Sequence, residues 1–240
     1  MDLTDAVAVV TGASSGLGTH FSRSLIDRGA TVYGLARSAD KLDALQDDLG
    51  DSFRPVTCDV REEDQVADAF QTVRDESGRI DVLLNNAGLG QFGPVDDLPL
   101  DEWDVQMDTN LRGGFLCTRE AVPTMREQNE DAGVGGHIVN VASIAGLLGN
   151  PNLTAYNASK FGLRGFSESL MKEVREDGIR VTCIYPGSIE TNFFDVAGVE
   201  MTDNPLRPED VAATVVHVLE SPANHLISEL VMRPLRPQGE

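Results

Sequence analysis

The stretch AVAVVTGASSGLG, residues 6–18, decides the fold. Its five leading apolar residues predict a short buried strand, and the run from Thr11 to Gly18 follows at once and opens a helical pattern. Glycines allow a tight turn and a close approach of the backbone to a pyrophosphate, while the free amides and dipole of a helix N-terminus favour negative charge. A glycine-rich turn alone is a weak signal, but in this position it predicts a nucleotide site.

Short apolar runs alternate with longer amphipathic runs along the rest of the chain. We expect strands at residues 6–10, 31–36, 53–57, 81–85, 137–142, 180–185 and 228–232. We expect helices at residues 16–28, 38–48, 62–77, 101–128, 154–177 and 208–220. This alternation predicts an α/β fold: a single Rossmann-type domain over residues 1–240, with a doubly wound parallel sheet of about seven strands and helices on both faces.

The charge balance is strongly acidic. The chain has 39 Asp and Glu against 19 Lys and Arg, a net charge of −20, and its only lysines are Lys41, Lys160 and Lys172. Such a surface makes nucleic acid and anionic membranes poor partners. Acidic, lysine-poor surfaces suit proteins that remain soluble in concentrated salt, so we hypothesise a halophilic source, with an ordinary acidic cytosolic enzyme as the alternative.

Two further features of the sequence concern membrane spans and the cysteines. No apolar run approaches the ~20 residues of a membrane span, and we expect a cytoplasmic protein. Cys58, Cys117 and Cys183 are odd in number and widely spaced within or beside apolar runs, which predicts buried thiols rather than disulfides or metal ligands. We expect no metal site.

Tyr156 and Lys160 carry the strongest chemical signal. They stand four residues apart in a helical pattern, with Ser143 thirteen residues before the tyrosine, so the two side chains share one helix face. A nearby ammonium favours the phenolate and lowers the pKa of a tyrosine, which prepares it for acid–base work. Taken alone, such a pair is more often a packed ring with a snorkelling lysine.

The ordered motifs resemble the short-chain dehydrogenase/reductase family over essentially the full chain, in its compact branch. They are the TGxxxGxG loop at 11–18, Asp59-Val60, the run Asn85-Asn86-Ala87-Gly88, Asn110, Ser143, the YxxxK pair, and Pro186-Gly187 followed by Thr191. The resemblance implies that the protein is an enzyme acting on CH–OH groups with NAD(P). It also implies that Tyr156 donates a proton to the substrate oxygen, and that Lys160 lowers the tyrosine pKa and binds the nicotinamide ribose.

The resemblance assigns the other site residues as well. Ser143 would hydrogen-bond the carbonyl oxygen, and Asn110 would hold a water that links Lys160 to solvent; the catalytic set is then Asn110, Ser143, Tyr156 and Lys160. The implied cofactor contacts, grouped by position along the chain, are Gly12, Ser14, Ser15, Gly16, Leu17, Gly18, Arg37, Asp59, Val60, Asn86, Ala87, Gly88, Tyr156, Lys160, Pro186, Gly187, Ile189 and Thr191. Asp59 would accept a hydrogen bond from the adenine amine.

Cofactor choice depends on the end of the second strand. NAD enzymes usually place Asp or Glu there, whereas this chain has Ala36 followed by Arg37, a guanidinium suited to a 2′-phosphate. We therefore expect NADP(H) to be preferred over NAD(H). Many NADP-dependent relatives carry a second basic residue in the glycine loop, where this chain has Ser14 and Ser15.

The substrate is less well defined. We expect an apolar set to face the site, with residues 188–206 as a substrate lid; the set is Leu89, Phe92, Ile144, Leu147, Leu148, Phe193 and Phe194. We favour a small carbonyl compound or secondary alcohol, of the 3-hydroxy acid or general carbonyl reductase type. A reductase of 3-oxoacyl thioesters is the alternative, although Asp177 stands where that group would have a carrier-binding arginine.

A function of another class is that of a non-catalytic NADP(H) sensor. This alternative is disfavoured because the chain has all four expected catalytic residues, Tyr156, Lys160, Ser143 and Asn110.

The resemblance also implies a homo-oligomer, a dimer or homotetramer, that pairs the helices at 101–128 and 154–177.

Overall fold

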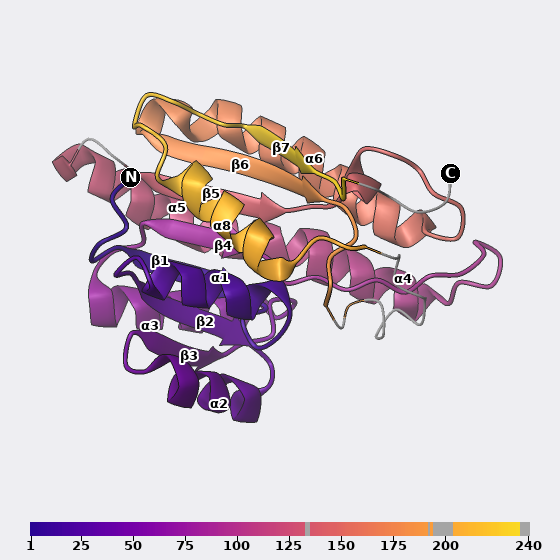
Figure 1. The fold of residues 1–240 in the computed structure, drawn as a ribbon, viewed down its shortest axis with the longest axis horizontal. Helices are drawn as coiled ribbons and strands as arrows, with labels where there is room; N and C mark the ends of the chain where they lie inside the picture. The colour runs from indigo at the N-terminus through magenta and orange to yellow at the C-terminus, as the bar shows by residue number, and fades with distance from the viewer. Residues whose placement is uncertain (133–134, 192, 194–203, 236–240) are drawn as a thin grey trace.

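Seven parallel strands form one sheet through the centre of the molecule (Figure 1). The computed structural model describes residues 1–132, 135–191, 193 and 204–235. The strand order is β3-β2-β1-β4-β5-β6-β7. The bounds are β1 Val7–Thr11, β2 Thr31–Ala36, β3 Phe53–Thr57, β4 Val82–Asn85, β5 Gly136–Val141, β6 Ile179–Pro186 and β7 Glu229–Met232. The α/β fold with a doubly wound parallel sheet is thereby confirmed.

Helices cover both faces of this sheet (Figure 1). On one face lie α1 (Leu17–Ile26), α2 (Ala39–Leu49) and α8 (Pro208–Leu219), and on the other lie α3 (Glu63–Ser77), α5 (Gly113–Ala132) and α6 (Thr154–Val174). Alternate residues of β1 feed the two cores: Ala8 and Val10 pack with the first set of helices, Val7 and Val9 with the second. Burial on both faces explains why the strands are continuous apolar runs.

The chain reverses its winding between β1 and β4. It runs outward from β1 to β2 and β3, then returns to place β4 on the other side of β1. Thr11, at the end of β1, joins the two halves, because its Oγ1 accepts the amides of Asn86 and Ala87 at 2.9 and 3.0 Å. Such a switch point opens a crevice at the carboxyl ends of the strands.

The long helix expected at 101–128 is the main departure from the expected elements. The structure has α4 (Leu100–Met107), a π-helical turn (Asp108–Arg112) and then α5. A π turn inserts one extra residue per turn and is a common device at functional sites, but amphipathic periodicity does not report it. The turn contains Asn110, which is buried.

The helix expected to reach residue 177 also ends early. Residues Arg175–Asp177 form a 3₁₀ turn after α6, and Gly178 closes it with φ +68°. A left-handed glycine is a common helix stop. Other boundaries differ from the expected ones by one or two residues, and residues 133–134 of the turn before β5 lie outside the described part of the chain.

All three cysteines are buried free thiols, as expected. Within the described residues, none of the helices has the length and apolar character needed to span a bilayer.

Candidate active site

A cavity of about 870 Å³ opens at the carboxyl ends of the strands. Most of the residues expected at the site line it, and they come from the ends of six strands and from α6: Gly12, Ser14, Ser15, Gly16, Leu17, Arg37, Asp59, Val60, Asn86, Ala87, Gly88, Ser143, Tyr156, Lys160, Pro186, Gly187, Ile189 and Thr191. Gly18 and Asn110 lie behind this lining. The structure therefore brings together in one cavity motifs that are far apart in the sequence.

The glycine loop is held by close backbone contacts. Gly12 has φ +66°, and a Cβ there would lie 2.9 Å from the Cα of Ala87. A Cβ at Gly18 would lie 2.1 Å from the Gly12 carbonyl oxygen, so only glycine lets α1 begin this close to the loop. The loop thus brings backbone close to the cavity at the start of a helix, which fits a pyrophosphate. The described residues therefore suit a dinucleotide cofactor.

Two cations stand at the far end of the cavity, after β2. Arg37 and Lys41 both line it and are exposed, and neither forms an ion pair with any residue that the structure describes. Lys41 was not expected at the site. Its signal in the sequence is its place four residues after Arg37 in a chain with only three lysines.

Asp59 follows β3, the edge strand beside β2, and its carboxylate is already hydrogen-bonded. Arg61 donates from Nη2 at 2.6 Å and from Nε at 3.0 and 3.1 Å, and this bonding holds the pKa of Asp59 below its usual value. An adenine amine would therefore share the carboxylate with Arg61.

Tyr156 occupies the opposite end of the cavity. It is 8 % exposed, and its hydroxyl is hydrogen-bonded to Ser143, which follows β5 in extended backbone. The rings of Phe92 and Phe193 flank the phenol, with centroids 5.5 and 5.7 Å from its own. Ser143 and Tyr156 can therefore bind one oxygen atom between them in an apolar surrounding.

The expected effect of Lys160 on Tyr156 is not present in this structure. Lys160 Nζ donates to the Val141 carbonyl at 2.9 Å and lies 5.7 Å from the centroid of the tyrosine ring. Burial raises the pKa of Tyr156 to about 12, with the Ser143 hydrogen bond opposing it, and burial lowers the pKa of Lys160 to about 8. The expectation of a lowered tyrosine pKa failed because desolvation dominates at both groups and Lys160 does not contribute to the shift of Tyr156.

Asn110 lies against the same region from behind. Its Oδ1 accepts the Leu89 amide and its Nδ2 donates to the Leu89 carbonyl, both at 2.8 Å, and Nδ2 also donates to Ser159 Oγ at 3.0 Å. A Cβ at Gly88 would lie 3.3 Å from Asn110 Oδ1 and 3.4 Å from Lys160 Nζ. Asn110 and Lys160 therefore meet at Gly88, although no direct bond joins them.

Part of the expected apolar set faces elsewhere. Leu89, Phe92, Ile144 and Phe193 line the cavity. In contrast, Leu147 packs in the cluster around Tyr185, Leu148 is 50 % exposed, and Phe194 lies outside the described residues. Sequence reasoning missed several lining residues in loops and turns, where no periodicity marks them: Thr109, Asn150, Leu153 and Ser188.

The expected lid is described only at its ends. The Glu190 amide donates to the Leu206 carbonyl and the Leu206 amide to the Ser188 carbonyl, both at 2.8 Å, and Ile189 and Leu206 pack on the core. Residues 192 and 194–203 lie outside the described part of the chain, and the lid remains a prediction.

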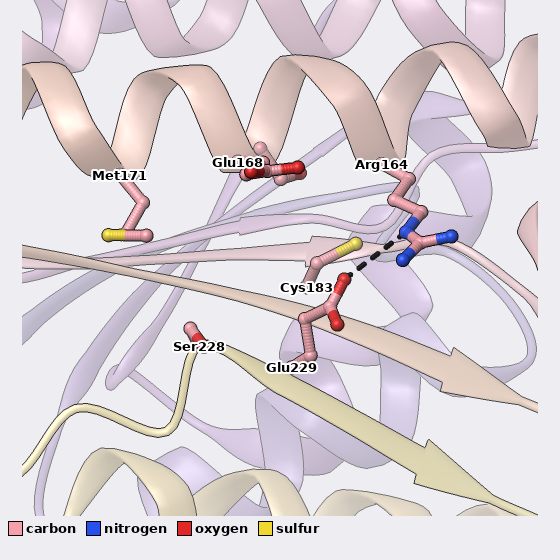
Figure 2. A pocket seen from close by; sticks show the side chains of 7 residues that line it. Arg164, Glu168, Met171, Cys183, Ser228 and Glu229 are labelled. Atoms are coloured by element: carbon pink, nitrogen blue, oxygen red, sulfur yellow. Dashed lines mark hydrogen bonds and ion pairs between the residues drawn. The ribbon is translucent and has the colours of Figure 1, made fainter.

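A second, smaller cavity of about 310 Å³ lies between α6 and strands β6 and β7. Figure 2 shows Arg164 and Glu168 on α6 above Glu229 on β7, with an ion pair of 3.3 Å between Arg164 and Glu229. Cys183 lies between the α6 side chains and Glu229 in this view, and burial raises the pKa of its thiol. None of the residues that line this smaller cavity also lines the cavity of about 870 Å³.

Comparison with known proteins agrees with this geometry. Residues 6–200 match the family described as short chain dehydrogenase. The chain belongs to the short-chain dehydrogenase family. It is therefore an oxidoreductase that acts on CH–OH groups with NAD(P).

Proteins similar to this short-chain dehydrogenase cover it almost completely. An uncharacterized oxidoreductase of Staphylococcus aureus (strain MRSA252) is 34 % identical, over 97 % of this chain and 99 % of the relative. A metagenomic short-chain oxidoreductase in complex with NADP is 33 % identical, with a TM-score of 0.85 over 98 % of this chain and 100 % of that one. A 3-ketoacyl-(acyl-carrier-protein) reductase from Brucella melitensis, complexed with NADH, is 26 % identical, with a TM-score of 0.90 over 98 % and 99 %. These complexes support a nicotinamide cofactor and leave the choice between its two forms open.

Proposed function

We propose that the protein is an NADP(H)-dependent oxidoreductase that transfers a hydride between the nicotinamide and a small carbonyl compound or secondary alcohol, with Tyr156 as the acid and base. One observation carries the proposal: the buried Tyr156 hydroxyl, bonded to Ser143, lies in the same cavity as the glycine loop. When bound, the cofactor supplies or accepts the hydride.

The residues around Tyr156 suit proton transfer to a carbonyl oxygen. A pKa raised to about 12 keeps the phenol protonated at neutral pH, so it can donate as negative charge builds on that oxygen. Ser143 offers a second hydrogen bond to the same oxygen. Lys160, with a pKa near 8, can hold or release a proton close to neutrality, and its ammonium is placed to reach ribose hydroxyls beside Gly88.

The preference for NADP(H) is supported by Arg37 and Lys41. A 2′-phosphate would lie near two cations that form no ion pair with any described residue. These two cations are present although the protein as a whole carries a net charge of −20. Lys41 supplies the second basic group that the glycine loop lacks. The remaining cofactor contacts proposed are those that line the cavity, together with Gly18 beneath the loop.

The test is kcat/KM for NADPH and NADH in Arg37→Ala and Lys41→Ala. Charge-assisted bonds to a phosphate predict a loss of about 10- to 100-fold for NADPH in each variant and little change for NADH. Arg175→Ala is the matched control, since it removes an exposed arginine outside the cavity. Equal losses for both cofactors, or equal efficiencies in the wild type, would refute the preference.

A reductase of 3-oxoacyl thioesters is the second candidate, and the similarity to the Brucella enzyme favours it. Against it, Asp177 forms an ion pair with Arg126 at 2.6 Å and offers no cation to an acidic carrier protein. A strong preference for acetoacetyl-coenzyme A over simple ketones would reverse this ranking. A sensor without turnover would be favoured if no carbonyl compound were ever reduced.

The protein is further proposed to form a dimer or homotetramer through α5 and α6. Phe115 on α5 and Phe161 on α6 are 44 % and 42 % exposed, which is high for large apolar residues. In sedimentation experiments Phe161→Asp should shift the protein towards the monomer, and an unchanged mass would contradict this interface. The proposed setting is the cytoplasm of a halophile.

A further inference from the structure

The substrate end of the cavity is built from aromatic rings. Phe92 comes from the loop after β4 and Phe193 from the segment after β6. Their ring centroids lie 6.3 Å apart, and both rings contact the ring of Tyr156. Their close packing depends on Gly90, where a Cβ would lie 2.7 Å from Phe92 and 2.9 Å from Phe193. Leu89, Ile144 and Leu153 extend this apolar wall. The carbonyl oxygen held by Tyr156 therefore belongs to a molecule whose neighbouring atoms meet rings and aliphatic groups.

Within the part of the chain that the structure describes, each cation that lines the cavity either follows β2 or is already hydrogen-bonded. Among the described residues that line the cavity, the cations are Arg37, Lys41 and Lys160. Arg37 and Lys41 follow β2, which is separated from β5 and Ser143 by β1 and β4. Lys160 donates to the Val141 carbonyl.

The interior of the expected lid is acidic in sequence. Residues 192–203 include no Lys, Arg or His but three acids, Asp195, Glu200 and Asp203. The whole chain is also strongly negative. A carboxylate next to the reacting carbonyl would lose its hydration in an apolar site without gaining a partner, which is the costly form of charge burial.

We propose that the substrate is a neutral ketone or aldehyde with an aromatic or other bulky apolar group beside the carbonyl, and that oxo acids are excluded by charge. This proposal rests on the proposed function and refines it, because it decides against the 3-hydroxy acid type. In the reduction, the carbonyl carbon gains the hydride of NADPH, the oxygen gains the proton of Tyr156, and NADP⁺ is released. A neutral substrate needs no counter-ion at any point of this step.

The first test compares an ester with its own acid. Ethyl benzoylformate and benzoylformate share the phenyl ketone and differ in charge and in one ethyl group, so the ratio of their rates of NADPH oxidation reports the effect of the charge together with that of a small apolar group. The proposal predicts a kcat/KM at least about 100-fold higher for the ester. Equal rates, or a faster acid, would overturn it. If neither these nor simple ketones were reduced, the proposed function itself would fail, and this refinement with it.

Two sets of variants test the parts of the site. Phe92→Leu and Phe193→Leu should lower the preference for acetophenone over 2-butanone by about 10-fold or more, while Phe115→Leu, on α5 outside the cavity, should not change it.

Leu153→Arg should raise kcat/KM for benzoylformate relative to its ester by about 10-fold, and Leu153→Met should not. An unchanged ratio in a Leu153→Arg variant that still reduces the ester would contradict exclusion by charge.

Discussion

At the scale of the residue, burial reverses the usual order of two acidities. A free tyrosine and a free lysine lose their protons at similar pH, but here the pKa of Tyr156 rises to about 12 and that of Lys160 falls to about 8. Both shifts have the same cause, since a site with little water disfavours every charged form. The tyrosine is thereby kept as a proton donor, and the lysine becomes the group that titrates near neutral pH.

Lys160→Met should stabilise the protein at pH 7 while abolishing its activity. The wild type then carries a buried ammonium, and a shift of the lysine pKa from 10.5 to about 8 corresponds to a cost of about 3 kcal/mol in the free energy of unfolding. Above pH 8 the folded lysine loses its proton, whereas the unfolded lysine keeps it to about 10.5, so wild-type stability rises and the difference shrinks.

Urea unfolding at pH 7 and pH 9.5 measures this difference. Lys172→Met is the control, because Lys172 is exposed on the same helix and pairs with Glu168. If Lys160→Met were less stable than the wild type at pH 7, or if its advantage did not shrink with pH, the burial account of the lysine pKa would be wrong.

Much of the site could be predicted at this scale because its chemistry sits in ordered motifs. The glycine loop, Ser143 and the Tyr156/Lys160 pair all reach one cavity. The tyrosine pKa could not be predicted, because spacing along a helix gives proximity but not burial. Lys41 and Leu153 were not predicted at the site for a related reason. A charged residue on a helix and an apolar residue in a loop usually have no function.

At the scale of the element, the join between β1 and β4 holds the two halves of the site together. The Thr11 hydroxyl accepts two amides from the segment after β4 and donates to the Leu84 carbonyl at 3.3 Å. The Asn86 side chain returns a bond to the Thr11 carbonyl at 2.9 Å. The Thr11 and Asn86 side chains therefore set the spacing between the glycine loop and Gly88.

Thr11→Val should lower both stability and cofactor affinity. It leaves the partly buried Ala87 amide without its partner, while the Asn86 amide keeps its bond to the Leu84 carbonyl at 3.0 Å. The cost should be about 1–3 kcal/mol in the free energy of unfolding, and NADPH binding should weaken about tenfold as the two loops separate. Thr57→Val, at the end of the edge strand β3, is the control. Unfolding in urea and NADPH titration measure the two effects, and a variant as stable as this control would argue against the join.

Sequence periodicity gives the strands and most helices at this scale, because each element is buried on a regular pattern. It misses the π turn at Asp108–Arg112 and the stop at Gly178, which depend on local backbone geometry. The π turn contains Asn110, so this irregular helical segment carries one of the candidate catalytic residues.

At the scale of the whole molecule, the charge of −20 opposes folding by self-repulsion in dilute salt. Screening shortens the range of this repulsion from about 10 Å at 0.1 M salt to about 3 Å at 1 M. If the acidic surface is an adaptation to salt, the melting temperature should rise by several degrees between 0.1 and 2 M KCl, as thermal unfolding would measure. An equal melting temperature and equal activity at both concentrations would favour an ordinary acidic enzyme.

The central claim is that Tyr156 gives its proton to a carbonyl oxygen during reduction with NADPH. Its most direct test is the rate of NADPH oxidation by the wild type and by Tyr156→Phe with ethyl benzoylformate, alongside NADPH binding measured by fluorescence. The account predicts a loss of turnover of about 10²- to 10⁴-fold with binding nearly unchanged. A Tyr156→Phe variant that oxidises NADPH as fast as the wild type would contradict it.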